Sequence, residues 1–239
     1  MPLRLRVVSY NIHRAIGVDR RFRPERIARI LRHHDADIVL LQETTPEWEA
    51  HLEHALGDAY PYRAFHHCCG AGGLAFLSVH PFEHQKVIEP PERGWFPAWM
   101  VVVDSLIGRL QALNVYLRPP FDDDGSVVSG YFVTKDIRRA EIERYVEALD
   151  PATPAIVAGD FNENRNGMAI GFLQARGMTS ALPEFEPSAA TWRWRTSVGT
   201  ASAQLDHIVY DERLTPVAAE VRDVGQSDHR PVLATFVLR

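Results

Sequence analysis

The sequence predicts a mixed α/β fold in which helices cover mixed β-sheets, and it argues against a purely parallel barrel. The 239 residues are 46% hydrophobic and 24% charged, values typical of a globular chain, which exclude a disordered, collagen-like or coiled-coil protein. Apolar runs of strand length recur along the chain and alternate only partly with helical patterns, so some predicted strands follow one another directly.

The first unit of the chain is predicted to be strand, helix, strand. Polar and apolar residues alternate over residues 3–10, which is typical of a strand. Pro24, followed by apolar residues with helical spacing, predicts a helix that ends near Asp35. The apolar run within residues 37–43 is too short for a helix and indicates a strand buried on both faces.

The remaining elements follow from the same patterns. Further strands are expected at residues 73–79, 99–104, 110–116, 155–158, 206–210, 216–221 and 231–238. Further helices are expected at residues 48–56, 135–149 and 167–176. The turn-rich residues 118–125 predict a surface loop, and no repeat or linker divides the chain, so residues 1–239 are expected to form a single domain.

Charge and composition narrow the possible partners and location. With 26 Lys and Arg against 31 Asp and Glu, the net charge of −5 argues against a protein that binds nucleic acid by bulk electrostatics. No apolar run approaches about 18 residues, and the N-terminus lacks a signal-peptide pattern, so we expect a cytoplasmic protein without a membrane span. A monomer is also expected. Cys68 and Cys69 are adjacent, below the usual Cα separation of a disulfide, and are not expected to bridge.

Clusters of polar residues adjoin four of the predicted strands. They are Asn11 with His13, Glu43, Asp160 with Asn162, and Asp228 with His229. Strand ends are where open α/β sheets gather their sites, and carboxylate and amide oxygens suit Mg²⁺ or Mn²⁺. Each cluster alone also has an ordinary explanation, as turn residues, strand-end caps or a surface ion-pair cluster.

Together these motifs resemble those of the endonuclease/exonuclease/phosphatase family, in the same order from residue 4 to residue 238. The motifs are Ser9-Tyr10-Asn11-Ile12-His13, Leu41-Gln42-Glu43, Gly73-Leu74-Ala75-Phe76-Leu77-Ser78, Gly159-Asp160-Phe161-Asn162, Leu205-Asp206-His207-Ile208 and Ser227-Asp228-His229-Arg230-Pro231. The resemblance implies a four-layer sandwich, with two mixed sheets face to face between helices and the site at one edge. It also implies hydrolysis of phosphoesters with a divalent metal.

The resemblance assigns a role to each matching residue. Metal ligands would be Glu43, Asn11 and Asp228. Asp160 would orient or deprotonate the attacking water, Asn162 would hold that water or a phosphoryl oxygen, and His229, oriented by Asp206, would stabilise the phosphoryl oxygens. Phosphoryl transfer requires such a set, namely an in-line nucleophile, a cation for the equatorial charge and a group that manages protons.

Two positions depart from the family pattern. Tyr116 stands where many members have a histidine, and it is predicted to donate a hydrogen bond to phosphate or, alternatively, to be a core tyrosine. His13 stands where repair-type members have a carboxylate, which weakens the case for a second metal there. Substrate contacts are expected from Asn11, His13, Asn162 and Arg118.

The substrate is the least determined part of the prediction. A small phosphoester or lipid head group is favoured over nucleic acid, because the basic residues are scattered and the acidic residues 122–124 follow Arg118 closely. A DNA or RNA nuclease of the same family and a non-catalytic binding module are the alternatives. Trp192 and Trp194 alternate as in a strand, and packing is favoured over stacking on a substrate.

Overall fold

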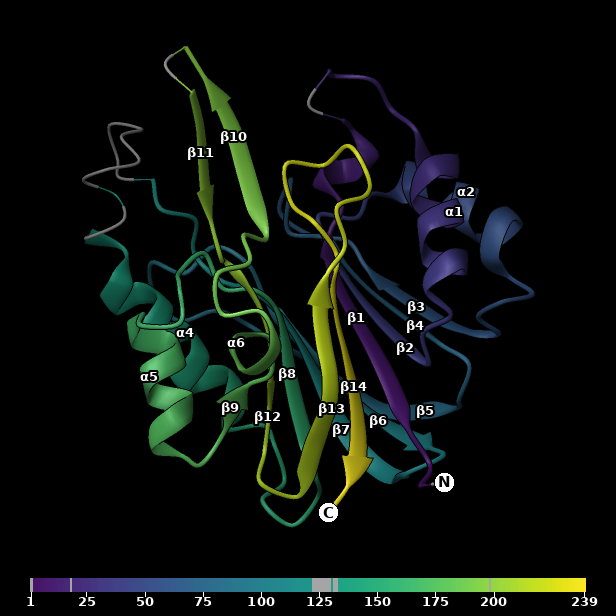
Figure 1. The fold of residues 1–239 in the computed structure, drawn as a ribbon, viewed down its shortest axis with the longest axis vertical. Helices are drawn as coiled ribbons and strands as arrows, with labels where there is room; N and C mark the ends of the chain where they lie inside the picture. Colours follow the sequence, from purple (N-terminus) through teal and green to yellow (C-terminus); the bar gives the residue numbers. More distant parts are fainter. Residues whose placement is uncertain (1, 18, 122–129, 131–132, 198) are drawn as a thin grey trace.

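The fold contains two six-stranded mixed sheets. A computed structural model describes residues 2–17, 19–121, 130, 133–197 and 199–239, and Figure 1 shows their arrangement. The first sheet has the strand order β13 (Leu214–Val221), β14 (Val232–Leu238), β1 (Leu5–Asn11), β2 (Ile38–Gln42), β4 (Leu74–Ser78) and β3 (Tyr62–His66). The second has the order β5 (Phe82–Ile88), β6 (Ala98–Ser105), β7 (Gly108–Tyr116), β8 (Ala155–Asp160), β12 (Asp206–Tyr210) and β9 (Thr179–Ser180).

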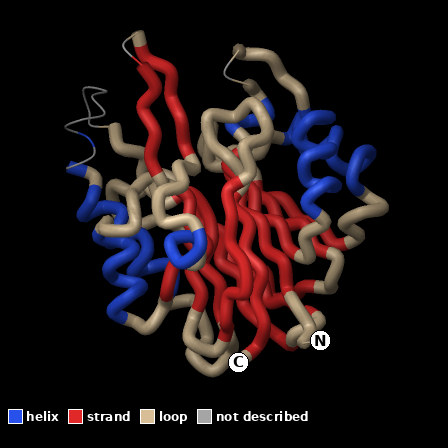
Figure 2. Tube along the Cα trace, in the orientation of Figure 1, coloured by secondary structure: helices blue, strands red, loops and turns tan. Residues whose placement is uncertain are grey.

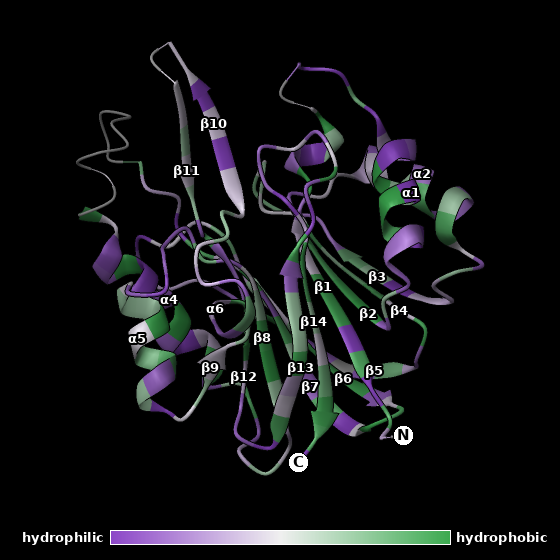
Figure 3. Ribbon diagram, viewed as in Figure 1, coloured by the Kyte–Doolittle hydropathy of each residue, from purple (hydrophilic) through white to green (hydrophobic). Residues whose placement is uncertain are grey.

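Helices cover the outer faces of both sheets, as Figure 2 shows. Helices α1 (Pro24–His34) and α2 (Pro46–Leu56) pack on the first sheet, and α4 (Lys135–Val146) and α5 (Met168–Ala175) pack on the second. Apolar side chains of the two sheets meet between them and form the central core, visible as hydrophobic strands in Figure 3. These four layers confirm the predicted sandwich.

Local sequence explains where the first helices begin and end. Pro24 lies in the first turn of α1, and Asp35 follows the helix in the left-handed conformation with φ 47°. Thr45 caps α2, because its side chain accepts a hydrogen bond of 3.2 Å from the backbone N–H of Trp48. The expected helix over residues 135–149 ends at Val146, where the backbone leaves the helix in a short turn.

Several elements were not predicted from the sequence. Strands β3, β5 and β9 were missed, and all three lie at sheet edges. Strand β9 and the helix α6 (Leu182–Phe185), which was also missed, are very short. The 3₁₀ helix η1 (His13–Ala15) was also missed. Of the predicted surface loop at 118–125, residues 122–125 lie outside the described residues.

One expectation about the cysteines was wrong. The structure contains a disulfide between Cys68 and Cys69. The two Cα atoms are 3.8 Å apart, below the usual range on which the expectation rested, and Cys69 adopts a left-handed backbone with φ 54°. The bridge closes a ring across a single peptide bond and joins no distant segments.

A two-stranded hairpin stands apart from both sheets. It consists of β10 (Trp192–Thr196) and β11 (Gly199–Ala203) and projects beyond the sandwich in Figure 1. Trp194 is 49% exposed, which argues against the packing that was favoured for this residue over stacking on a substrate. Within the described residues, no helix has the length and apolar character needed to span a membrane.

Gly159 is required by the close approach of two parallel strands. It lies in β8 opposite Val115 of β7 with φ 153°, and a Cβ atom there would lie 1.9 Å from the carbonyl oxygen of Val115. We expect Gly159→Ala to lower the free energy of unfolding by about 3 kcal/mol, because strain and overlap both act.

The measurement is the urea midpoint of unfolding, with Gly171→Ala as the matched control. A Cβ atom at Gly171 in α5 meets no atom within 4 Å, so that change should be neutral or raise stability by up to about 1 kcal/mol. Equal midpoints for the two variants would contradict the expectation.

Candidate active site

One edge of the sandwich collects the polar residues that adjoin the strands. Strands β1 and β2 run parallel and end at Asn11 and Gln42, while β7 and β8 run parallel and end at Tyr116 and Asp160. Strand β12 is antiparallel to β8 and pairs its first residue, Asp206, with Asp160. Because β14 is antiparallel to β1, the residues just before β14 reach the same edge, and these include Asp228 and His229.

Several polar residues that follow strands at this edge have a left-handed backbone. Among them, His13 has φ 46°, Glu43, directly after β2, has φ 58°, and Asn162, two residues after β8, has φ 51°. Such conformations are uncommon for non-glycine residues and cluster at functional sites. The backbone N–H of Asn162 donates to Asp160 Oδ1 at 2.9 Å, so this turn orients the Asp160 carboxylate.

His229 lies between two buried carboxylates. Its Nδ1 is 2.9 Å from Asp206 Oδ2 and 3.1 Å from Oδ1, and its Nε2 is 3.5 Å from Asp160 Oδ2. Since a carboxylate only accepts, Asp206 holds the proton on Nδ1 and fixes the orientation of the ring. Nε2 therefore faces Asp160 and the interior of the site.

Burial and charge shift the pKa values of this group. Burial lowers the pKa of His229, but the carboxylates of Asp206 and Asp160 outweigh it, and the net shift is upward. Burial also raises the pKa of Asp160, and Asp206 adds to this, while His229 opposes it. The group therefore favours an imidazolium on His229 and a carboxylate on Asp160 that binds a proton more readily than usual.

Asn11 bridges Asp160 and Glu43. Its amide nitrogen donates to Glu43 Oε1 and to Asp160 Oδ2, both at 3.1 Å, while its oxygen accepts from the backbone N–H of His13 at 3.0 Å. This orientation makes Asn11 a donor between two carboxylates. Tyr116 donates its hydroxyl to the same Glu43 Oε1 at 2.9 Å.

The Tyr116 ring is held in place by Phe96. It stacks on Phe96 with a centroid distance of 4.5 Å and an interplanar angle of 8°. Burial, followed by the charge of Glu43, raises the pKa of the Tyr116 hydroxyl, which therefore remains a proton donor. The ring thus belongs to the central core, while the hydroxyl reaches the polar cluster.

Asp228 has a separate set of partners. Its Oδ1 lies 2.8 Å from His13 Nδ1, and its Oδ2 accepts from Trp192 Nε1 at 3.0 Å. Burial raises the pKa of Asp228, but the hydrogen bond and charge of His13, the charge of His229 and the Trp192 bond lower it to about 2. The Asp228 bond in turn raises the pKa of His13.

Two supporting residues were missed from the sequence. Trp192 was assigned to packing, yet its indole N–H binds Asp228. Ser227 donates to the backbone oxygen of Asn11 at 2.9 Å and accepts from the backbone N–H of His229 at 3.1 Å. The position of Ser227 inside a recognised motif was a signal for its role, whereas nothing in the sequence near Trp192 indicated its partner.

The structure places Arg118 and the Asn162 side chain in supporting positions. The Arg118 guanidinium carbon lies 3.3 Å from the Trp95 ring centroid, and the guanidinium also donates to the backbone oxygen of Phe121. The Asn162 side chain donates to the backbone oxygen of Leu117 at 3.0 Å. These contacts fix the segment that follows β7, next to Tyr116.

A buried ion pair lies beneath this segment. Arg138 Nε is 3.3 Å from Glu163 Oε2, and both side chains are inaccessible to solvent. Arg138 also donates to the backbone oxygen of Arg118, and Glu163 Oε1 accepts from the backbone N–H of Ile170 in the first turn of α5. Because Arg138 lies in α4, the pair joins α4 and α5 to the segments that follow β7 and β8, behind the site.

His207 is a buried neutral imidazole behind Asp206. Its Nε2 lies 3.0 Å from the backbone oxygen of Glu163, which can only accept, so Nδ1 accepts from the Ser180 hydroxyl at 3.0 Å. Burial lowers the pKa of His207 to about 4. Protonation of Nδ1 would remove the hydrogen bond that the Ser180 hydroxyl donates to it.

This burial predicts a pH-dependent stability. On unfolding, the His207 pKa returns to about 6.5, so between that value and about 4 the unfolded chain binds an extra proton. Stability should therefore fall as the pH decreases through this window, by up to about 3 kcal/mol from this residue.

The measurement is urea unfolding at pH 7 and pH 4.5, comparing the wild type with His207→Gln. The variant has no proton to gain and should show a smaller difference between the two pH values. Identical pH dependence in both proteins would exclude His207 as a cause.

Comparisons with known proteins place the chain in a family. The sequence matches the profile of the Endonuclease/Exonuclease/phosphatase family over residues 8–229. No protein with a curated description matches. Among solved structures, an endonuclease/exonuclease/phosphatase from Beutenbergia cavernae is 20% identical with a TM-score of 0.81, over 98% of this chain and 72% of that one.

Two further structures have the same fold. The catalytic domain of human Nocturnin with bound sulfate has a TM-score of 0.75 at 20% identity, over 100% of this chain and 97% of that one. TDP2 from Caenorhabditis elegans has a TM-score of 0.72 at 18% identity, over 98% and 74%. Fold and profile define a hydrolase of phosphoric ester bonds, a class in which metal dependence is typical. The chain belongs to the endonuclease/exonuclease/phosphatase family.

Proposed function

We propose that the protein is a Mg²⁺- or Mn²⁺-dependent phosphoesterase that hydrolyses a phosphodiester or phosphomonoester by in-line attack of water. The observation that carries this proposal is the Asp206–His229–Asp160 group, joined through Asn11 to Glu43 at one edge of the sandwich. A buried carboxylate with a raised pKa and a protonated imidazole facing it supply the proton acceptor and the donor that phosphoryl transfer requires.

Each residue has a proposed task. Asp160 accepts the proton of the attacking water, and Asn162 fixes the turn that orients Asp160. His229 donates from Nε2 to a phosphoryl oxygen, while Asp206 keeps the ring protonated and aligned. Tyr116 donates to Glu43 in this structure, and we propose that its hydroxyl donates to a phosphoryl oxygen of a substrate bound beside Glu43.

The metal is proposed to bind at Glu43. Among the described residues, both hydrogen bonds to this carboxylate reach Oε1, so Oε2 is available to a cation, and the oxygen donors suit Mg²⁺. Asn11 and Asp228 are the further proposed ligands, although both have protein partners here. A bound divalent ion would neutralise charge on the phosphoryl oxygens.

A second group of residues, besides Glu43, could also hold a cation. Ligand atoms of Asp160, Asp206 and His229 lie within 4.8 Å of one another. In this group, however, the imidazolium of His229 already supplies the positive charge between the two carboxylates. We therefore favour Glu43 as the principal ligand.

A compact phosphoester, small molecule or lipid head group, is the proposed substrate class. The net charge of −5 gives no bulk attraction for a polyanion. We expect only weak binding to duplex DNA, and binding that falls steeply between 50 and 200 mM salt, since counterion release would supply most of the affinity. Fluorescence anisotropy of a labelled duplex measures this.

The deciding experiment is an assay panel with Mg²⁺ at one enzyme concentration. Its substrates are plasmid DNA, abasic duplex, RNA, sphingomyelin and inositol phosphates. The proposal expects a compact substrate to be turned over fastest. If plasmid nicking at physiological salt exceeds every compact substrate, the nuclease alternative replaces it, and if nothing is turned over, the binding-module alternative does.

A further inference from the structure

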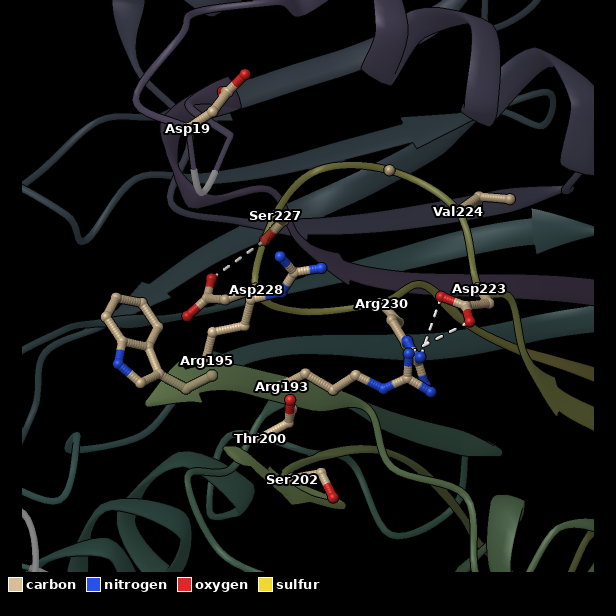
Figure 4. Close-up of a pocket in the computed structure, with 12 residues that line it drawn as sticks. Asp19, Arg193, Arg195, Thr200, Ser202, Asp223, Val224, Ser227, Asp228 and Arg230 are labelled. Carbon is tan, nitrogen blue, oxygen red and sulfur yellow. Dashed lines mark hydrogen bonds and ion pairs between the residues drawn. The ribbon is translucent and has the colours of Figure 1, made fainter. Parts of the chain in front are cut away.

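A pocket of about 800 Å³ opens beside the candidate active site. One wall is the β10–β11 hairpin, and the other is the segment from Asp223 to Arg230, as Figure 4 shows. Asp228 lines both this pocket and the polar cluster described above. A molecule bound at His229 therefore has the pocket within reach of its remaining groups.

The strand register places four polar side chains on one face of the hairpin. Arg193 pairs with Ser202, and Arg195 pairs with Thr200. Directly opposed residues of an antiparallel pair share a face, as do residues two apart in a strand. Two guanidinium groups and two hydroxyl groups thus belong to the same face, and all four line the pocket.

The pocket walls carry three arginines and three carboxylates, but two of these carboxylates are paired with residues outside the pocket. Arg193 and Arg230 both contact Asp223, at 3.3 and 3.0 Å, and this shared carboxylate neutralises only one of them. Arg195 has no ion-pair partner among the described residues, and Figure 4 shows its guanidinium directed toward the segment of Ser227 and Asp228. The other two carboxylates of the pocket are paired elsewhere, Asp19 with Arg23 and Asp228 with His13.

The hairpin is joined to the catalytic segment at its base. The backbone N–H of Arg193 donates to the oxygen of Asp228 at 2.9 Å, and Trp192 forms an isolated β-bridge with His229. Arg193 and Arg195 therefore lie one and three residues after Trp192, which contacts His229 directly. Their positions are coupled to His229 through backbone, and do not depend on a long loop.

We propose that this pocket binds a second phosphate group of the substrate, held by Arg195 and Arg193 with Thr200 and Ser202. Guanidinium groups match phosphate oxygens in pairs, and hydroxyl donors complete such a site. The inference rests on the proposed function and deepens it: the preferred compact substrate carries two phosphates, one hydrolysed at His229 and one retained in the pocket. A terminal phosphate and the next phosphate of a polynucleotide share this chemistry.

The test uses three p-nitrophenyl phosphodiesters of one nucleoside that differ at the second hydroxyl. That hydroxyl is free in the first, carries a terminal phosphate in the second, and is linked to a further nucleotide in the third. With Mg²⁺, wild type should show a kcat/KM about tenfold higher for the second than for the first, and Arg195→Ala should remove that ratio. Arg109→Ala removes the same charge at the opposite end of the second sheet and should keep the ratio.

Binding supplies an independent readout. Calorimetry of pyrophosphate with chelator-treated protein should give a dissociation constant about tenfold weaker for Arg195→Ala than for Arg109→Ala. The proposal is overturned if the two variants agree in both the kcat/KM ratio and the dissociation constant. A gain confined to the third substrate would overturn the compact source of the phosphate. No turnover of any substrate would refute the proposed function, and calorimetry would still decide the pocket.

Discussion

Replacing Asp160 by Asn is expected to reduce turnover of an activated aryl phosphodiester by about 10²–10⁴-fold, with folding intact. The amide cannot take a proton from water, yet it preserves the size of the side chain and can still accept from the backbone N–H of Asn162. The change also removes the acceptor of the Asn11 amide and the charge that faces His229, so some stability should be lost as well. The loss of turnover should appear in kcat.

His229→Ala is expected to lose turnover to a similar extent, about 10²–10⁴-fold, because it removes the donor between Asp206 and Asp160. Asp211→Asn is the matched control for Asp160→Asn, because it makes the same chemical change beyond the opposite end of β12. Asp211 accepts there from the backbone N–H of Ala155. Circular dichroism verifies folding of all three variants. Near wild-type turnover in Asp160→Asn and His229→Ala would remove this site assignment.

Removal of divalent metal is expected to abolish activity, and addition of Mg²⁺ or Mn²⁺ should restore it. The carboxylates of Glu43, Asp160 and Asp228 meet at one edge, and without a cation they would repel a phosphate group. The measurement is turnover in chelator, followed by titration of each metal. Full activity in chelator would contradict the proposed cofactor.

Two variants distinguish the two candidate metal positions. Mn²⁺ binding, measured by electron paramagnetic resonance, should weaken about tenfold or more in Glu43→Gln and change little in His229→Ala. The reverse order would place the ion in the Asp160, Asp206 and His229 group. The same titration thus tests the ligand assignment separately from catalysis.

Most of the fold was predictable because its central strands are short apolar runs buried on both faces. Residues 37–43 and 155–158 are examples, and both lie in the middle of a sheet. The edge strands were harder, since β3 and β5 carry charged and aromatic residues on partly exposed faces. Their pairing with β4 and β6 supplies a stability that local sequence does not record.

The candidate residues were predictable because they adjoin strands, but their partners were not. Asn11 was expected as a metal ligand, but the sequence did not indicate that its amide nitrogen donates to Glu43 and to Asp160. The Arg138–Glu163 pair joins residues 25 positions apart through tertiary packing alone. The single domain, the monomeric state and the cytoplasmic location stay predictions.

The position of β14 has a consequence for the order of folding. This strand enters the first sheet between β13 and β1, so the earliest and latest strands of the sequence become direct neighbours. Pairing over such a separation carries a large loop-closure entropy and slows the search for the native topology. A nascent chain that has not yet presented β14 leaves the edge of β1 open, and His229, just before β14, is not yet held beside Asp206. The contact between His229 and Asp206 therefore forms only after β14 has paired with β1, so the candidate site is assembled late in folding.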